Sequence, residues 1–247
     1  MAADLLKLRC FIIHLERAYK RAPQVQRLVE ALPLEAEIVS AIDGSMQDFD
    51  VGPYFQSSLI KPKYPFALRP AEVATFLSHQ KCWQRIVDED VDAGLILEDD
   101  VNIHQPTFDE ALSLAMENIQ QGDVVRFPIQ LREKLVNEIS VAGDVKLFRP
   151  IQVGLGAQAQ LVTRLAAQKL LAKTKRFDRP IDTYLQVFWE HGVRILSVWP
   201  NGVSEHSEKL GGSLIGAKQT PWSKLNHEIK RPIYRLKVSK LARNNYV

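Results

Sequence analysis

The chain has 247 residues, of which 46% are hydrophobic and 25% are charged, and its formal net charge is +3. A chain of this length and composition can bury a core within one domain, or within one domain and an appendage. No apolar segment is long enough to span a bilayer, and the N-terminus is too mixed for a secretory signal. The two cysteines, Cys10 and Cys82, fall in a predicted strand and a predicted helix. We expect buried thiols and neither a disulfide nor a metal site, which favours a reducing cytoplasm.

Strand patterns and helix patterns alternate along the chain. In chain order we expect a strand at 8–15, a helix at 18–32, a strand at 35–42, a long loop at 45–65, a helix at 70–87, a strand at 93–97, a helix at 108–119, strands at 124–127, 145–151 and 159–162, helices at 165–173 and 182–191, and a strand at 194–199. Long loops inside compact domains are often functional. The alternation predicts an α/β fold with a mostly parallel central sheet flanked by helices.

Three consecutive carboxylates end an apolar strand. Residues 95–97 are Leu-Ile-Leu, and Glu98, Asp99 and Asp100 follow them directly. Desolvating an unpaired carboxylate is costly, so such a cluster needs water, cations or a metal. Strand ends of open α/β sheets are where ligands collect, and Mg²⁺ or Mn²⁺ prefers oxygen ligands. The alternative interpretation is a solvated turn that is acidic.

Positive charge is concentrated at the C-terminus. Residues 224–247 hold seven Lys or Arg against one Glu, a local charge of +6, while the residues before them carry −3. Apolar residues are interleaved with these charges, so the segment fits either an anionic membrane surface or a solvated helix packed on the domain. Nucleic-acid binding is disfavoured, because no recognisable reading motif accompanies the charge.

Several short motifs follow one another in a characteristic order. They are Ile13, His14, Arg17 and Arg21 near the first strand; Asp43 and Gly44 after the second; Glu72, Leu77, Ser78, His79 and Trp83 in the next helix; the acidic motif at 95–101; Gly156 and Ala157; and Pro180, Ile181 and Asp182. Their order and spacing, over residues 9–216, resemble glycosyltransferase family 25. His14 replaces the Asn common in that family, and Gln158 and Gln160 replace its usual Thr and aromatic residue. The resemblance therefore does not identify the donor sugar.

That family comprises bacterial lipopolysaccharide and lipooligosaccharide glycosyltransferases and the sugar-transfer domains of collagen-modifying enzymes. The resemblance implies a GT-A-like nucleotide-sugar-binding fold, here at 1–220, followed by a basic appendage at 221–247. It implies an inverting, metal-dependent hexosyltransferase, which often uses UDP-galactose and acts on a lipopolysaccharide or another cell-surface glycan or glycolipid acceptor. We expect the chain in the cytoplasm, with residues 224–247 in peripheral contact with the inner face of an anionic cytoplasmic membrane.

The resemblance also implies metal ligands. In families with this acidic motif the last carboxylate usually touches the metal, which here is Asp100. Side chains alternate along a strand, so Glu98 shares a face with Asp100 and is the second choice. His206, in a late Gly-rich loop at 201–216, is a further candidate, since some GT-A enzymes supply a ligand there. Mn²⁺ or Mg²⁺ at this point would stabilise the charge that develops on the leaving diphosphate.

The other motif residues are candidates for binding the nucleotide sugar. They are Ile13, His14, Arg17, Arg21, Asp43, Gly44, Ser78, Glu98 and Asp99. Guanidinium groups offer two parallel donors to a phosphate, and an imidazole hydrogen-bonds a base or a ribose. The alternative interpretations are structural: solvated arginines on a helix face, and a turn at 43–44. His79 is expected to be a hydrogen-bonded core residue.

An inverting transfer needs a base to take the proton from the attacking hydroxyl. Asp182 is the candidate, although an Asp at a predicted helix N-terminus is also a favoured cap. Asp178, Glu205 and Glu208 are its rivals, and the last two lie in the late loop.

Two functions from other classes compete with this interpretation. A response-regulator receiver also has an apolar strand that ends in acids, but Asp144 precedes the apolar run at 145–148 instead of following one, and the first ninety residues would stay unexplained. A catalytically silent nucleotide- or carbohydrate-binding protein with a transferase fold remains the alternative. Nucleotide binding without sugar transfer would distinguish it.

Overall fold

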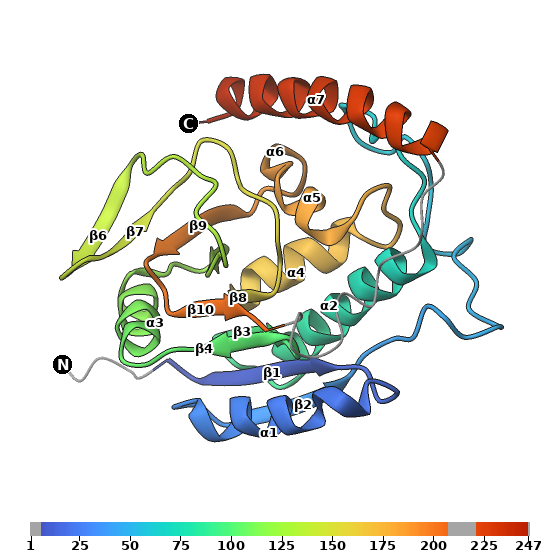
Figure 1. Cartoon of the computed structure of the whole chain (residues 1–247). Coiled ribbons are helices and arrows are strands. Elements are labelled where there is room, and N and C mark those ends of the chain that lie inside the picture. Colours follow the sequence, from blue (N-terminus) through green and yellow to red (C-terminus); the bar gives the residue numbers. More distant parts are fainter. Residues whose placement is uncertain (1–5, 207–220, 247) are drawn as a thin grey trace.

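The computed structural model describes residues 6–206 and 221–246, except for the side chains of 221–228. An eight-stranded sheet forms its centre, in the order β2-β1-β3-β8-β5-β9-β7-β6 (Figure 1). In that order the strands span Ala36–Ser40, Leu8–His14, Ala93–Glu98, Ala159–Thr163, Asp123–Arg126, Arg194–Trp199, Val145–Phe148 and Glu138–Ala142. A two-stranded sheet pairs β4 (Val101–Ile103) with β10 (Val203–Glu205).

Most strands of the central sheet run in one direction. β1 is parallel to β2 and to β3, and β5 is parallel to β9. β8 is antiparallel to β3 and β5, and β7 is antiparallel to β9 and β6. Parallel strands end on the same edge of a sheet, and the register pairs Ile13 at the end of β1 with Glu98 at the end of β3. The predicted α/β class, with helices flanking the sheet, is confirmed.

Helices cover both faces of the sheet. α2 (Pro70–Asp88), α4 (Arg164–Lys173), α5 (Ile181–Leu185) and α6 (Phe188–His191) pack on one face, and α1 (Ala22–Ala31) and α3 (Thr107–Asn118) pack on the other. Alternation along β1 sends Phe11 and Ile13 into the first core. Cys10 and Ile12 enter the second core. Cys10 and Cys82 are buried free thiols, as predicted, and burial raises the pKa of both.

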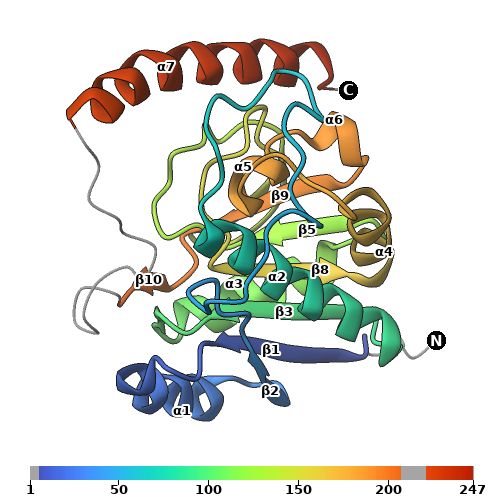
Figure 2. The same cartoon turned by 90° about the vertical axis from the view of Figure 1, so that its right-hand side faces the viewer.

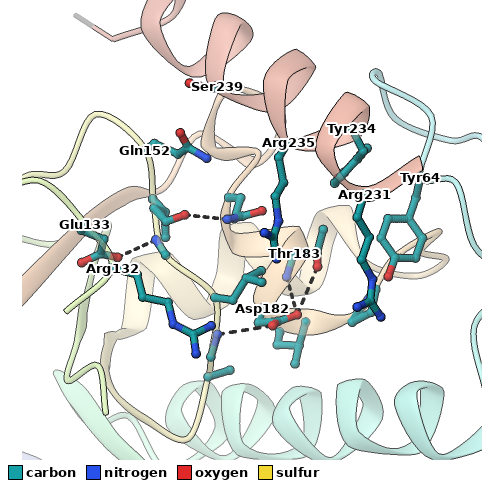
Figure 3. A pocket seen from close by; sticks show the side chains of 18 of the residues that line it. Tyr64, Arg132, Glu133, Gln152, Asp182, Thr183, Arg231, Tyr234, Arg235 and Ser239 are labelled. Carbon is teal, nitrogen blue, oxygen red and sulfur yellow. Dashed lines mark hydrogen bonds between the residues drawn. The ribbon is translucent and has the colours of Figure 1, made fainter. Parts of the chain in front are cut away.

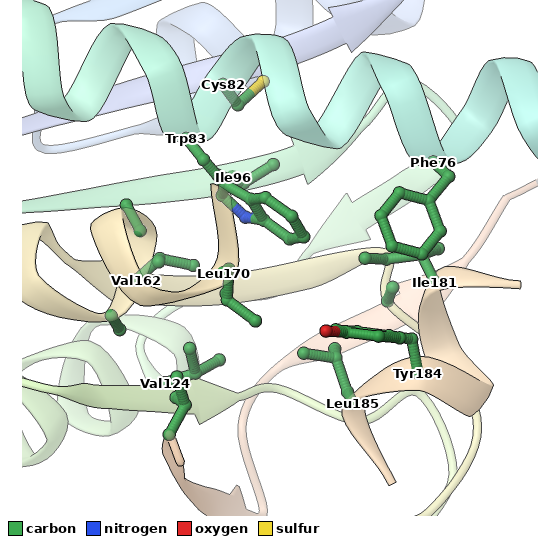
Figure 4. Packing of buried hydrophobic residues seen from close by; sticks show 14 of the residues in the cluster. Phe76, Cys82, Trp83, Ile96, Val124, Val162, Leu170, Ile181, Tyr184 and Leu185 are labelled. Atoms are coloured by element: carbon green, nitrogen blue, oxygen red, sulfur yellow. The ribbon is translucent and has the colours of Figure 1, made fainter. Parts of the chain in front are cut away.

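Aromatic rings fill the core beneath α2 (Figure 4). Phe76 stacks on Phe177 with ring centroids 3.9 Å apart, and it meets Trp83 and Tyr184 edge to face. Phe177 precedes α5 and Tyr184 belongs to it. These ring contacts therefore hold α5, and the Asp182 that it carries, in a defined position against α2.

Residues 182–191 form two short helices, so the single helix predicted there is wrong. α5 ends at Leu185 and α6 begins at Phe188. The side chain of Gln186 donates a hydrogen bond of 2.6 Å to the carbonyl of Val153. Val187 has ψ of 50°, which lies outside the helical range. A contact with a distant loop thus interrupts a pattern that is helical by sequence.

Strands β4, β6 and β10 are absent from the sequence prediction. β6 is an edge strand with mostly exposed side chains, so it shows no apolar alternation. β10 occupies part of the predicted late loop, and residues 207–216 of that loop lie outside the described residues. The strand predicted at 145–151 ends at Phe148, before Pro150, which cannot donate to the ladder.

α7 (Pro221–Asn244) packs on the rest of the fold along one face, through the buried side chains of Tyr234, Val238 and Ala242. Figures 1 and 2 show it beyond α5 and α6, on the side of the molecule away from α1. The basic segment is therefore a helix packed on the domain, one of the two expected alternatives. The boundary at residue 220 adjoins residues that are not described, and the division into domain and appendage stays a prediction. Neither α7 nor another described helix is long and apolar enough to cross a membrane.

A buried arginine joins α7 to two loops. Arg179 donates to the carboxylate of Asp178, at 2.7 and 3.2 Å, and to the hydroxyl of Tyr234 at 2.9 Å. It also donates to the carbonyls of Ile60 and Pro62, and the N–H of Ile60 donates to Asp178. Asp178 therefore has a structural counter-charge, which does not favour it as a catalytic base.

We predict that Asp178→Asn lowers the free energy of unfolding by about 3–5 kcal/mol, because it leaves the buried guanidinium of Arg179 without its counter-charge. Chemical denaturation at neutral pH measures this loss. Asp48→Asn is the control, since Asp48 is exposed, and its effect should stay within about 0.5 kcal/mol. Equal losses in the two variants would show that the buried pair does not stabilise the fold.

Candidate functional site

The three carboxylates of the acidic motif have different partners. Asp99 is almost fully buried, and its two oxygens are held by Arg21 Nη1 at 2.5 Å and by His14 Nδ1 at 2.7 Å. Arg21 Nη1 also donates to Asp100 Oδ2 at 3.2 Å. Arg21 ends the 3-10 turn Tyr19–Arg21, and Pro23 at the start of α1 helps to fix the chain there. Four of the predicted site residues, from the end of β1, the 3-10 turn and the segment after β3, thus meet at one edge of the sheet.

Glu98 points to the α2 side of that edge. Its Oε1 lies 3.2 Å from Nε2 of the buried His79. Gln160 Nε2 on β8 donates to His79 Nδ1 at 3.1 Å, so the imidazole keeps its proton on Nε2 and donates it to Glu98. His79 is therefore the hydrogen-bonded core residue that the sequence predicted, and it orients Glu98.

Asp100 carries a carboxylate whose negative charge is incompletely compensated. Burial and, to a smaller extent, the charge of Glu98 raise its pKa, which Arg21 lowers, and the net result is a pKa of about 7. Sites that attract a cation typically contain several carboxylates close together whose total negative charge exceeds the positive charge of the neighbouring side chains. The oxygen donors of Asp100 and Glu98 fit a hard divalent ion by their chemistry.

The β4–β10 pair brings His206 to the acidic motif. β10 lies antiparallel to β4, and the backbone N–H of His206 donates to the carbonyl of Asp100 at 2.7 Å. Glu205 is close enough to raise the pKa of Asp100. Among the described side chains, no three His, Cys, Asp or Glu converge on one point with metal-ligand geometry. Glu208 lies outside the described residues.

The predicted nucleotide residues that follow β1 and β2, together with Ser78 on α2, form a second cluster with structural contacts. Arg17 Nε donates to Asp43 Oδ2 at 2.6 Å, and this hydrogen bond lowers the pKa of Asp43 to about 2. Ser78 Oγ accepts the N–H of Ile42 at 2.9 Å. A Cβ on Gly44 would lie 2.5 Å from the carbonyl oxygen of residue 70, so only glycine fits against the start of α2.

The side chain of Ile13 on β1 is buried in the core, so only its backbone lies at the edge of the sheet where the acidic motif is. Contact of these residues with a nucleotide stays a prediction.

A cavity of about 1020 Å³ extends from the acidic motif to α7 (Figure 3). Glu98 lines one part of it, the loop at 151–158 and the start of α5 line the middle, and α7 lines the far side. The cavity wall contains Asp182 but not Asp100, Arg21 or His14.

Asp182 is held in this cavity by backbone donors. Its Oδ1 accepts the N–H of Thr183 at 2.6 Å and the Thr183 hydroxyl at 3.2 Å, and its Oδ2 accepts the N–H of Gly156 at 3.3 Å. Pro180 and not Asp182 occupies the N-cap position of α5, so the capping alternative is wrong. The structure thus brings together Glu98, the Gly156 motif and the Asp182 motif, which are far apart in sequence.

The sequence reasoning missed a group of cationic side chains in the same cavity. They are Arg132, Lys134, Arg231, Arg235 and Arg243. The three arginines of α7 recur at a spacing of four and eight residues, which places them along one side of a helix. This spacing was the available signal, but it was counted only as part of the basic charge of the C-terminal segment.

Comparison with known proteins identifies these motifs. The profile of glycosyltransferase family 25 (LPS biosynthesis protein) matches residues 7–185. A glycosyltransferase 25 family member of Drosophila melanogaster is 27% identical over 192 residues, which are 74% of this chain and 31% of that protein. Procollagen galactosyltransferase 2 of Homo sapiens is 31% identical over 120 residues, which are 46% of this chain and 19% of that protein. The chain therefore spans only a part of the length of these relatives.

The match with the family profile includes β1, the acidic motif and Asp182, and it ends before β10 and α7. It covers most of the chain, and the sequence motifs on which the resemblance rests lie at one edge of the sheet and along one cavity. The chain belongs to glycosyltransferase family 25.

Proposed function

We propose that this protein is a glycosyltransferase that binds a nucleotide-sugar donor at the acidic edge of the sheet and a glycan acceptor in the cavity beneath α7. One observation carries the proposal: a single cavity contains both Glu98 of the acidic motif and the carboxylate of Asp182. The names of the human and Drosophila relatives support sugar transfer, and the human name supports galactose as the transferred sugar. UDP-galactose is therefore the proposed donor.

The proposed chemistry is a single displacement with inversion. The acceptor hydroxyl attacks the anomeric carbon, the bond from that carbon to the diphosphate oxygen breaks, and Asp182 takes the hydroxyl proton. The N–H groups of Thr183 and Gly156 fix the orientation of the carboxylate before the transfer. The diphosphate leaves with the electron pair of the broken bond.

A divalent cation, Mn²⁺ or Mg²⁺, is proposed at the acidic edge. Asp100 is the proposed ligand, with Glu98 and His206 as its neighbours, and the remaining positions would be filled by diphosphate oxygens and water. Such a cation supplies positive charge to the leaving diphosphate. Arg21 and His14 hold Asp99 and so keep the backbone of the motif in place.

We predict that Asp182→Asn lowers turnover by about 10²–10⁴-fold, because the amide cannot accept the proton. Release of UDP from UDP-galactose in the presence of a lipooligosaccharide acceptor measures turnover. Donor binding should survive, since the cavity keeps its shape. Asp144→Asn, at an exposed turn, is the control. Full turnover in Asp182→Asn would move the base to another residue.

We predict that UDP raises the melting temperature only when Mn²⁺ is present, and that Asp100→Asn abolishes this rise. A ligand at a hundredfold excess over its dissociation constant stabilises the native state by about 2.7 kcal/mol. Differential scanning fluorimetry with UDP, GDP, ADP and CMP provides the comparison. A shift that persists in Asp100→Asn would remove Asp100 as the ligand. Nucleotide binding without turnover would favour the silent binder.

The outer face of α7 supports the proposed membrane contact. Ile229, Ile233 and Leu236 are exposed on this face, and Lys237 and Lys240 accompany them. Exposed apolar side chains flanked by lysines suit the surface of an anionic bilayer, such as the cytoplasmic face of a membrane that carries a glycolipid acceptor.

We predict that Leu236→Glu weakens binding to vesicles that contain anionic lipid by about tenfold, because it removes one apolar side chain from the interface. Co-sedimentation with phosphatidylcholine vesicles, with and without phosphatidylglycerol, measures the partitioning. Leu165→Glu is the matched control: it replaces another exposed leucine on a helix and changes the net charge equally. Equal partitioning of both variants would remove α7 from the membrane contact.

A further inference from the structure

The charges that line the cavity are unevenly compensated. Two of its carboxylates have arginine partners, since Glu72 pairs with Arg69 and the buried Glu133 pairs with Arg126. Arg69 also lines the cavity, and the other five cationic side chains there take part in no ion pair among the described residues: Arg132, Lys134, Arg231, Arg235 and Arg243. Repulsion between like charges in a partly enclosed space is unfavourable, and a bound anion relieves it.

Two of these cationic side chains contact uncharged groups, which position them without neutralising their charge. Arg132 donates to the amide oxygen of Gln130, at 2.9 and 3.3 Å. The guanidinium of Arg231 lies over the ring of Phe66, 5.8 Å from its centre. Such contacts reduce the freedom of long side chains while their donors stay available to a ligand.

Among the described side chains of α7, from residue 229 onward, the arginines and the lysines lie on different sides with respect to the cavity. Arg231, Arg235 and Arg243 line the cavity, whereas Lys230, Lys237 and Lys240 do not. A guanidinium offers a planar pair of donors that matches a phosphate or a carboxylate, and an ammonium does not. A helix that served only as a general positive surface would not require this division.

The helix is held firmly in this orientation. The hydroxyl of Tyr234, next to Arg235, accepts a hydrogen bond of 2.9 Å from Nη1 of the buried Arg179. Val238 and Ala242 are buried below it. The arginines that alternate with these buried positions therefore project into the cavity from a rigid element.

The arginines reach toward the proposed base. Figure 3 shows Arg231 and Arg235 pointing from α7 toward Thr183 and Asp182, with Arg132 approaching from the opposite wall. Asp100, the proposed cation ligand, does not line this cavity, and neither do Arg21 and His14, which hold Asp99. An anion held by α7 would thus lie on the acceptor side of Asp182.

We propose that α7, together with Arg132 and Lys134, forms a subsite for an anionic group, a phosphate or a carboxylate, on the acceptor glycan. The assignment to an acceptor rests on the proposed function. The anionic group anchors the acceptor so that one of its hydroxyls lies beside Asp182. Since the family match ends at residue 185, the arginines of α7 select acceptors through a part of the chain outside the matched segment.

The test uses mannose 6-phosphate as the charged probe and mannose as the neutral one. Isothermal titration calorimetry is performed on the full chain with saturating UDP and Mn²⁺, so that the donor site is filled. We expect the phosphorylated sugar to bind and mannose to bind at least about tenfold more weakly. The double variant Arg231→Gln/Arg235→Gln should lose about tenfold or more in affinity for mannose 6-phosphate.

The double variant Lys237→Gln/Lys240→Gln is the matched control, because it removes the same charge from the outer side of the same helix. Equal losses in the two double variants would overturn the subsite, since net charge alone would then explain binding. Binding of mannose 6-phosphate that appears only when UDP is omitted would assign the arginines to the donor diphosphate and would also overturn the subsite.

The UDP-dependent melting shift is measured in parallel on every variant. If wild-type protein binds mannose 6-phosphate but shows no UDP shift, the proposed transferase function fails while the anion subsite stands. If UDP binds and the charged sugar does not, the subsite fails while the proposed function stands.

Discussion

The burial of Asp99 between Arg21 and His14 is the interaction on which the acidic edge depends. β3 is almost completely buried, and it delivers three consecutive carboxylates to the edge of the sheet. Their desolvation would oppose folding of this edge unless positive charge were nearby. Arg21 provides one guanidinium for two of them. Because Arg21 follows β1 and precedes α1, the same contact joins three elements and determines where Asp100 lies.

Negative and positive side chains gather in two separate regions of the molecule, the acidic edge of the sheet and the cavity wall formed by α7. Carboxylates gather at the ends of β3 and β10, and arginines that form no ion pair among the described residues gather under α7. Asp182 lines the cavity that connects these regions. This separation is complementary to a donor that arrives with a cation and to an acceptor that carries negative charge, and it keeps the opposite charges from neutralising one another within the protein.

Buried strands and amphipathic helices could be predicted from the sequence, because an element that is buried on one or both faces has apolar residues in a local, regular pattern. The single helix predicted at 182–191 failed where Gln186 bonds to Val153, a contact with a distant loop. β6 was missed because an exposed edge strand has no apolar period. The order of the family motifs indicated Asp100 and Asp182 without revealing that Asp182 lines the cavity and Asp100 does not. The cationic lining was missed because its residues come from two distant segments.

The sequence by itself determined the α/β class, the position of the acidic motif at a strand end and the four-residue spacing of the α7 arginines. These are local properties, set by side-chain period and by chain order. Only the tertiary structure decided that Arg21 neutralises Asp99, that Gln160 and His79 orient Glu98, and that Asp182 and the α7 arginines share one cavity. Each of these contacts joins residues that are far apart in the chain, and their proximity follows from strand order and helix packing, which no local pattern encodes.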